Sequence, residues 1–144
     1  MRVYIASKYI DHKKINNQIY GELKNASIDA FLPESINIDA LTKEEMYAVS
    51  EICYAEITKC DVILAVCPFG KSVSSELGYA IALKRTLPES KVIIALNMDF
   101  EHEAMLYPYV DKNVNSISQL IEYLTQLNGS TLMIPQQTSP TGTI

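Results

Sequence analysis

Glu76 is the residue whose position in this sequence most clearly suggests chemistry. It lies in the segment DVILAVCPFGKSVSSELGYAIALKR (residues 61–85), after an apolar run that ends at Pro68 and before a helical apolar run that begins at Leu77. We expect it in the first turn of a helix, where the helix amides would keep its carboxylate ionised at neutral pH. Such a carboxylate can act as a nucleophile or as an electrostatic stabiliser. A structural role is also open, because Glu in a first turn favours the helix by about 0.3–1 kcal/mol.

Hydroxyl and lysine side chains occur just before Glu76 and again after the first apolar run. They are Ser7, Lys8, Lys71, Ser72, Ser74 and Ser75. Hydroxyls, a lysine and helix amides are the groups that bind a phosphate. One of the serines could instead be the N-cap of the helix, and Ser and Lys are also ordinary loop residues. Gly78, inside the helix, costs about 1 kcal/mol relative to Ala, which suggests that a ligand or a packed strand approaches the backbone there.

Composition limits the classes of function. The chain has 144 residues and a net charge of −5, which fits one domain and argues against binding of a nucleic-acid polymer. No apolar run approaches the roughly 18 residues of a membrane span, and no signal peptide is visible, so we expect a cytoplasmic protein without membrane association. The three cysteines form no CxxC pair and are interpreted as reduced core thiols. The two histidines are both expected at the surface, which argues against a metal site, and we expect no cofactor.

Strand-like and helix-like apolar patterns alternate along the chain. Strands are expected at 3–6, 28–32, 62–67 and 92–96 and around 114, and helices at 11–25, 42–59, 76–86, 100–107 and 117–127. The first helix carries Ile15, Ile19 and Leu23 on one face. Thr42 is expected to begin the second helix through a capping box. The segment 62–67 is apolar at every position, which is typical of a central strand covered on both faces.

This order of elements predicts the fold class. We expect α/β architecture: a single-domain, three-layer, doubly wound parallel five-stranded sheet of the flavodoxin or Rossmann-like type, formed by residues 1–128. The polar residues 129–144 are expected to be a flexible tail or an arm that lies on another subunit. Ligands of such folds bind at the carboxyl ends of the strands, near a topological switch point. The loops at 6–10, 68–74 and 97–104 should therefore gather at one edge and form the pocket.

Several segments carry a resemblance to a known family. The residues Ser75 to Ala80 read SELGYA and follow DVILA at 61–65, the chain opens with VYIAS at 3–7, and VDKNV occupies 110–114. Together these segments resemble the nucleoside 2-deoxyribosyltransferase family, which includes the deoxynucleoside 5′-monophosphate N-glycosidases. The resemblance spans roughly residues 2 to 125.

The resemblance implies cleavage of the N-glycosidic bond of a nucleoside or nucleotide. Glu76 would attack the anomeric carbon of the sugar and form a glycosyl-enzyme, which a second base or water then resolves. Tyr4 would orient Glu76, although a strand tyrosine is often only a packing residue. Ala6 and the residues after it would bind substrate together with Gly70 and the serines. Met105 would border the base or serve as a core residue, and a neighbouring subunit would complete the site, so a homodimer or higher homo-oligomer is expected.

The sequence departs from the family pattern at two positions. Members carry a second carboxylate seven or eight residues ahead of the position of Asp61, where this chain has Tyr54 and Cys53. Glu51, one turn earlier, either substitutes for it or is a surface charge, and Asp61 is expected to cap the start of its strand. Transferases also carry an acid six residues before the nucleophile, where this chain has Gly70. Both departures argue against ordinary base exchange. The hydroxyl and lysine side chains of the two loops favour a 5′-monophosphate substrate.

Two other functions remain open on the sequence. The missing second carboxylate is compatible with a non-catalytic nucleotide-binding sensor or signalling module on the same fold. An NAD-cleaving domain of the TIR type shares a similar sheet and a catalytic Glu, but the ELGYA context at 76–80 argues against it. The preferred base, the preferred sugar and the choice between hydrolysis and transfer depend on the geometry of the site and not on these motifs.

Overall fold

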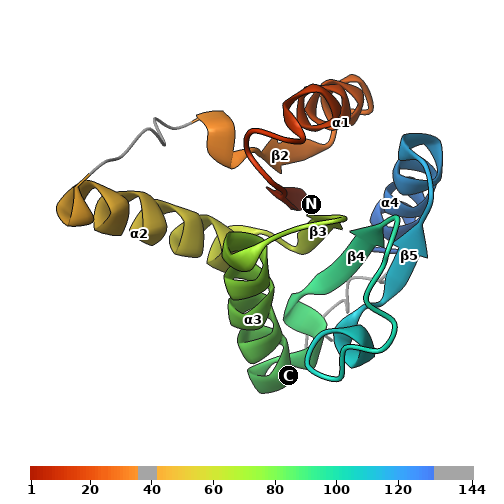
Figure 1. Cartoon of the computed structure of the whole chain (residues 1–144). Helices are drawn as coiled ribbons and strands as arrows, with labels where there is room; N and C mark the ends of the chain where they lie inside the picture. The colour runs from red at the N-terminus through yellow and green to blue at the C-terminus, as the bar shows by residue number, and fades with distance from the viewer. Residues whose placement is uncertain (36–41, 132–144) are drawn as a thin grey trace, which may run out of the picture.

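The computed structural model describes residues 1–35 and 42–131, which form a five-stranded sheet flanked by helices (Figure 1). The strand order is β2-β1-β3-β4-β5, and each neighbouring pair is parallel. In chain order the elements are β1 (Arg2–Ala6), α1 (Lys13–Asn25), β2 (Asp29–Phe31), η1 (Pro33–Ser35), α2 (Lys43–Lys59), β3 (Val62–Val66), α3 (Lys71–Thr86), η2 (Pro88–Ser90), β4 (Val92–Leu96), η3 (Tyr107–Tyr109), β5 (Lys112–Val114) and α4 (Ile117–Thr131). The predicted α/β sheet is confirmed.

The two faces of the sheet bury separate apolar cores because successive residues of a strand point to opposite sides. On one face, Val3 and Ile5 of β1 pack with residues of α1 and α4. On the other face, Tyr4 and Ala6 pack with residues of α2 and α3. Strand β3 is buried at every position, as its uninterrupted apolar sequence predicts. Tyr4 therefore faces the same layer as the helix that carries Glu76.

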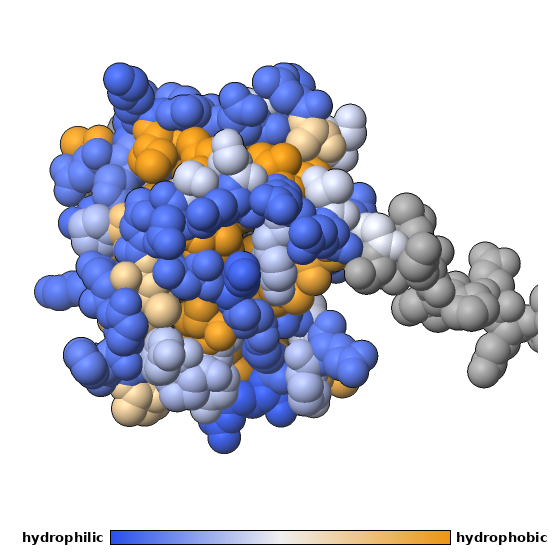
Figure 2. Space-filling view, turned by 90° about the vertical axis from the view of Figure 1, so that its right-hand side faces the viewer, coloured by the Kyte–Doolittle hydropathy of each residue, from blue (hydrophilic) through white to orange (hydrophobic). Residues whose placement is uncertain are grey.

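The outer surface is mainly hydrophilic on the side where α4 and β5 lie. Figure 2 views the molecule from that side and shows apolar residues only in small areas between polar ones. No helix within residues 1–35 and 42–131 combines the length and the apolar character that a membrane crossing requires. In the same part of the chain, no three His, Cys, Asp or Glu side chains are grouped so that they could hold a metal ion.

The topology places the switch point between β1 and β3. The chain continues from β1 to β2 on one side of the sheet, then crosses to β3 and adds β4 and β5 on the other side. Ala6 and Ala65 pair at the carboxyl end of the two central strands. In a doubly wound sheet the loops that leave these two strands diverge, and a crevice opens between them.

Helix α3 begins at Lys71 with Gly70 as N-cap, earlier than any of the starts expected from the sequence. The serines between Gly70 and Glu76, which are typical of a loop, lie inside the helix. The hydroxyls of two of them donate to backbone carbonyls one turn earlier. Ser74 Oγ donates to Gly70 O at 3.1 Å and Ser75 Oγ donates to Lys71 O at 3.1 Å. None of the serines is therefore the N-cap, and Glu76 lies in the second turn rather than the first.

Other boundaries also differ from the expectation. The helix expected at 100–107 is replaced by turns and the short η3, which contains Pro108. Helix α4 continues to Thr131, past the boundary expected at 128, and the remainder of the expected tail lies outside the described residues. Thr42 is confirmed as the N-cap of α2, since its side chain accepts from the Glu45 amide at 3.1 Å.

Asp61 holds the beginnings of two strands together, as expected. Its Oδ2 accepts from the Arg2 amide at 2.9 Å, and its own amide donates to Arg2 O at 2.9 Å. Asp61 lies at the amino edge of the sheet, opposite the edge where ligands of this architecture bind. Its role is structural.

Candidate active site

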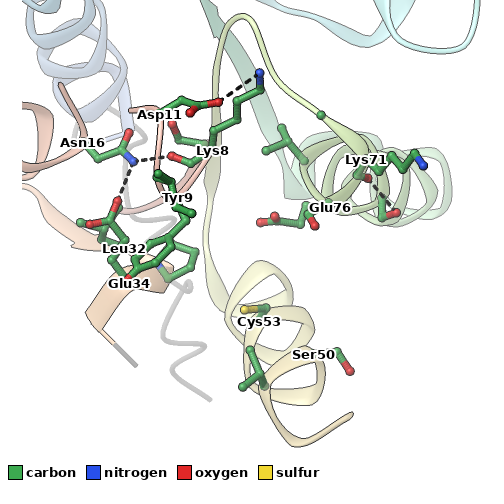
Figure 3. A pocket seen from close by; sticks show the side chains of 18 of the residues that line it. Lys8, Tyr9, Asp11, Asn16, Leu32, Glu34, Ser50, Cys53, Lys71 and Glu76 are labelled. Atoms are coloured by element: carbon green, nitrogen blue, oxygen red, sulfur yellow. Dashed lines mark hydrogen bonds and ion pairs between the residues drawn. The ribbon is translucent and has the colours of Figure 1, made fainter. Parts of the chain in front are cut away.

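A pocket of about 760 Å³ lies at the carboxyl edge of the sheet, where the loops after β1 and β3 diverge (Figure 3). It is lined by the loops after β1, β2 and β3, by the first turns of α3 and by one face of α2. The lining residues include Ser7, Lys8, Tyr9, Asn16, Leu32, Glu34, Cys53, Tyr54, Gly70, Lys71, Ser72 and Glu76. A cavity of this size matches a drug-sized ligand or a nucleotide.

Glu76 projects from the second turn of α3 into this pocket (Figure 3). Its Oε2 atom is buried, and no residue in the described parts of the chain forms a hydrogen bond with it. Burial raises the pKa of Glu76 to about 7, and the nearby Tyr4 hydroxyl lowers it in part. The expectation of a fully ionised carboxylate at neutral pH is therefore wrong, because burial places the pKa of Glu76 near neutrality. The helix begins too early for its dipole to compensate, because the dipole acts mainly within the first turn.

Tyr4 lies beneath the pocket, on β1. Its side chain is 0% exposed, and its ring stacks on Phe31 with a centroid distance of 5.5 Å. Burial, followed by the negative charge of Glu76, raises the pKa of Tyr4 far above its usual range, so the phenol remains protonated. Its hydroxyl is buried without a hydrogen-bond partner among residues 1–35 and 42–131. Tyr4 and Glu76 thus influence each other's pKa without a hydrogen bond of normal geometry between them.

One face of α2 forms the wall opposite α3. The residues that line the pocket from this helix are Met46, Val49, Ser50, Cys53 and Tyr54. Burial raises the pKa of the Cys53 thiol, and the Tyr4 hydroxyl opposes that shift in part. The positions where a second carboxylate was expected therefore do face the site, with a neutral thiol and a phenol in its place.

Glu51 does not line the pocket. It is exposed on α2, because it follows the pocket-facing Ser50 by one residue and is rotated about 100° around the helix axis. Of the two roles considered for Glu51, the structure gives the surface charge. The Glu51 carboxylate therefore lies outside the pocket.

Lysines, a serine and a helix N-terminus meet at the end of the pocket near the β1 and β3 loops. Lys8, Gly70, Lys71 and Ser72 all line it. Lys8 Nζ lies 3.7 Å from Asp11 Oδ2, and a Cβ added at Gly70 would stand 4.0 Å from Lys8 Cε. The cationic side chain thus reaches across to the start of α3. This combination has the donors and the positive potential that bind an anion.

Ser7 is tied to a histidine that was expected at the surface. A hydrogen bond of 3.1 Å joins Ser7 Oγ and His12 Nδ1, and His12 is half-buried. Both residues belong to the loop between β1 and α1. Ser7 lines the pocket, while the hydrogen bond fixes the start of that loop.

Three of the expected substrate-binding residues do not line the pocket. Ala6 is fully buried in the core, Ser74 is exposed on the outer side of α3, and Met105 is 75% exposed. The loop at 97–104 does reach the same sheet edge, where Phe100 packs on Phe69 with ring centroids 5.5 Å apart. Met105 follows this loop and lies outside the lining of the pocket.

Gly78 is exposed, and no atom lies within 4 Å of a Cβ added there. The packed strand proposed from the sequence is therefore wrong. The residue faces away from the cavity, so the described residues give no steric reason for a glycine at this position.

Asn16 and Glu34 were missed from the sequence. Asn16 is 1% exposed, and its Nδ2 donates to Lys8 O at 3.0 Å and to Glu34 Oε1 at 2.8 Å. Asn16 shares a helical face with Ile19 and Leu23, and all three are buried, whereas Ile15 is only partly buried. A polar residue at i, i+3, i+7 spacing with two apolar ones was the available signal.

The fold of this chain has relatives among solved structures. No family model and no curated protein matches the sequence. A 2-deoxyribosyltransferase from Bacillus psychrosaccharolyticus is similar in structure, with a TM-score of 0.69 and 12% identity, over 85% of this chain and 92% of that one. A conserved protein from Enterococcus faecalis gives a TM-score of 0.64 and 16% identity, over 88% and 98%. The CMP N-glycosidase of Clostridium botulinum gives 0.54 and 18%, over 87% and 99%.

These alignments cover most of each pair of chains, so the likeness concerns the whole described domain and not a shared fragment. At sequence identities this low, structural similarity establishes the shared fold. The reaction has to be argued from the residues of the pocket. The resemblance found in the sequence is thereby confirmed at the level of the fold. The chain has the single-domain α/β fold shared by a 2-deoxyribosyltransferase and a CMP N-glycosidase.

Proposed function

We propose that this protein cleaves the N-glycosidic bond of a nucleoside 5′-monophosphate, with Glu76 as the nucleophile. The observation that carries the proposal is the Glu76 carboxyl group, which lies in a pocket of nucleotide size at the switch point and has a buried oxygen that no described residue satisfies. A buried carboxyl group without a partner destabilises the folded protein, and such groups are concentrated at functional sites.

In the first step, ionised Glu76 attacks C1′ of the sugar while the bond from C1′ to the base nitrogen breaks. The bonding pair leaves with the base, which takes a proton from water in the open pocket. The sugar remains as an ester of Glu76. A water molecule, or the ring nitrogen of a second base, then attacks C1′ and gives up its proton to the hydroxide left by the first step, and Glu76 leaves as a carboxylate.

In this step Tyr4 donates a hydrogen bond and does not transfer its proton. Its raised pKa keeps the phenol protonated, and the hydroxyl lies close enough to lower the pKa of Glu76. A bound substrate that draws the carboxylate toward C1′ would let Tyr4 hydrogen-bond to the other oxygen. Tyr4 is then a positioning residue, which acts through Glu76.

The end of the pocket formed by Lys8, Lys71 and Ser72 suits the 5′-phosphate. The first amides of α3 point there without side-chain capping, since the N-cap Gly70 has no side chain. Lys8 Nζ, which lies 3.7 Å from Asp11 Oδ2, would pair with the phosphate in place of Asp11. This arrangement supports a nucleotide in preference to a nucleoside.

A base-release assay tests the proposal. Ribo- and deoxyribonucleoside 5′-monophosphates and the matching nucleosides are incubated with the protein, with and without a second free base. We expect free base from the monophosphates, and a loss of about 10³-fold or more in kcat/KM for Glu76→Ala, typical for removal of a nucleophile. A new nucleotide in the presence of the second base identifies transfer, and free base alone identifies hydrolysis. Equal rates for Glu76→Ala and the parent protein would refute the proposal.

One observation favours a second function, a nucleotide sensor without turnover. The α2 wall carries Cys53 and Tyr54 where a second carboxylate was expected, so the pocket has one acidic group near the sugar position in place of two. In that case nucleotides bind tightly, Glu76→Gln leaves the affinity unchanged, and no base is released over hours. Calorimetry together with the base-release assay distinguishes the two functions.

The proposal includes a cytoplasmic homo-oligomer. Helix α2 borders the pocket and exposes several large apolar side chains, with Met46 52%, Tyr47 67% and Ile52 44% exposed. An exposed apolar area beside a site suits contact with another protein surface, and a second copy of this chain would cover it and narrow the pocket. Molar mass in solution by light scattering tests this part, since a monomer at all concentrations contradicts it.

A further inference from the structure

Glu34 forms the far wall of the pocket, across from Glu76 and Lys71 (Figure 3). It follows β2 directly in the chain and lies in η1. Asn16 donates to Glu34 Oε1 at 2.8 Å, and within the described residues nothing binds Oε2. The carboxylate is thus held in place by one oxygen and leaves the other available to a ligand.

The amide of Asn16 is fully used as a donor. Its two N–H groups go to Lys8 O at 3.0 Å and to Glu34 Oε1 at 2.8 Å. Lys8 Nζ is paired with Asp11 and points away from this corner in Figure 3. Around Glu34 the group left open is an acceptor, and the phenol of Tyr9 can either donate or accept.

The proposed function fixes the orientation of the ligand. With C1′ against Glu76 and the phosphate at the start of α3, the base extends toward β2. There Tyr9, 38% exposed, and Leu32 provide apolar surfaces that suit the faces of a flat ring, and Glu34 lies at its edge. The edge of the base that is far from the sugar therefore meets a carboxylate.

A carboxylate discriminates between bases by charge and by hydrogen-bond type. It accepts from an exocyclic amino group, as Glu and Asp do with N4 of cytosine. A keto oxygen at the same place puts two acceptors against each other and leaves the buried groups unpaired, which specific sites use to reject close analogues. Cytosine and adenine carry the amino group, whereas uracil and hypoxanthine carry the oxygen.

We propose that Glu34 is a specificity-determining residue that selects nucleotides whose base carries an exocyclic amino group on the edge far from the sugar. This inference rests on the proposed function for the orientation of the ligand. Asn16 is the positioning residue that holds Glu34, and it ties the β1 loop to the end of β2.

The test compares matched pairs of nucleotides. The ratio of kcat/KM for base release is measured for CMP against UMP and for AMP against IMP, in ribose and deoxyribose forms. The dissociation constants of the same nucleotides are measured by calorimetry with Glu76→Gln, which cannot turn them over. Both readouts are repeated for Glu34→Gln, whose Oε1 can still accept from Asn16 while its amide nitrogen becomes a donor. Glu89→Gln is the matched control, because it removes the same charge from an exposed position in η2.

We expect the parent protein to favour the amino member of each pair by at least tenfold in kcat/KM or in affinity. Glu34→Gln should abolish or reverse this preference, and Glu89→Gln should keep it. Equal use of both members by the parent protein overturns the inference, as does an unchanged ratio in Glu34→Gln. Absence of base release from every nucleotide refutes the proposed function alone, since the affinities still decide the role of Glu34.

Discussion

Two buried polar sites at opposite edges of the sheet, Lys91 and the Tyr4–Glu76 pair, differ in how far their hydrogen-bonding groups are satisfied. At the amino edge, Lys91 is 7% exposed, and its ammonium donates to Thr58 O at 2.9 Å and Cys60 O at 2.7 Å. At the carboxyl edge, Tyr4 Oη and Glu76 Oε2 are buried without partners in the described residues. The first arrangement closes the end of α2 and stabilises the fold, while the second leaves hydrogen-bonding capacity unused.

This difference indicates where stability has been given up. An unsatisfied buried polar group costs about 1–3 kcal/mol, and the carboxyl edge contains two of them close together. A ligand that supplies the missing partners recovers that free energy on binding. Substitutions at the amino edge should therefore affect folding, and substitutions at the carboxyl edge should affect the chemistry and leave the fold intact or more stable.

The largest effect on stability is expected from Lys91→Met. The substitution keeps the volume and leaves the carbonyls of Thr58 and Cys60 without their donor, so unfolding should become easier by about 2–4 kcal/mol. Denaturant unfolding measures it. Lys59→Met is the control, because Lys59 is 63% exposed and its ion pair with Glu56 is worth little at the surface. If Lys91→Met lowers the free energy of unfolding by less than Lys59→Met does, the contrast between the two edges is false.

The arrangement of the sheet was predictable because each strand can be recognised from the apolar pattern of its own residues. The uninterrupted apolar runs at 62–66 and 92–96 require cover on both faces, and only a parallel sheet between helix layers provides it. The position of the pocket followed from the same topology. Glu76 and Lys8 were found because each follows the end of a strand in the chain.

The details of the site depended on contacts that the sequence does not state. The start of α3 was missed because serines that hydrogen-bond back to the preceding turn have the composition of a loop. Asn16 was missed because its reason for burial, Glu34, lies in another element. The ionisation of Glu76 was misjudged for the same cause, since burial by distant residues outweighs the helix end.

Glu76→Gln should stabilise the folded protein at alkaline pH. The folded carboxyl group has a pKa of about 7 against an ordinary value of 4.5. Between these values the folded state binds more protons than the unfolded state, so wild-type stability falls as pH rises through this window and levels off above it. Gln removes the fall, and the variant should gain on the order of 3 kcal/mol at pH 8 and almost nothing at pH 4.

Thermal or denaturant unfolding of both proteins across pH 4–8 checks this. Glu89→Gln again serves as the control, because an exposed carboxylate should give no pH-dependent difference. A variant that is less stable than the parent at pH 8 would mean that Glu76 supports the fold, and the contrast between the two edges would then be false.

The smallest effect on stability, and the sharpest on mechanism, is expected from Tyr4→Phe. The hydroxyl has no partner in the described residues, so its removal should change the free energy of unfolding by less than about 1 kcal/mol. In the parent protein, kcat/KM should rise with pH to a plateau above an apparent pKa near 7, because attack requires the ionised Glu76.

In Tyr4→Phe that apparent pKa should move upward, because the hydroxyl that lowers the pKa of Glu76 is gone. The substrate phosphate also titrates near pH 6, but its contribution is common to both proteins and cancels in the comparison. A residue that only fills the core would lower kcat/KM equally at every pH. An unchanged profile in Tyr4→Phe would therefore separate Tyr4 from the chemistry and leave Glu76 to act on the substrate without it.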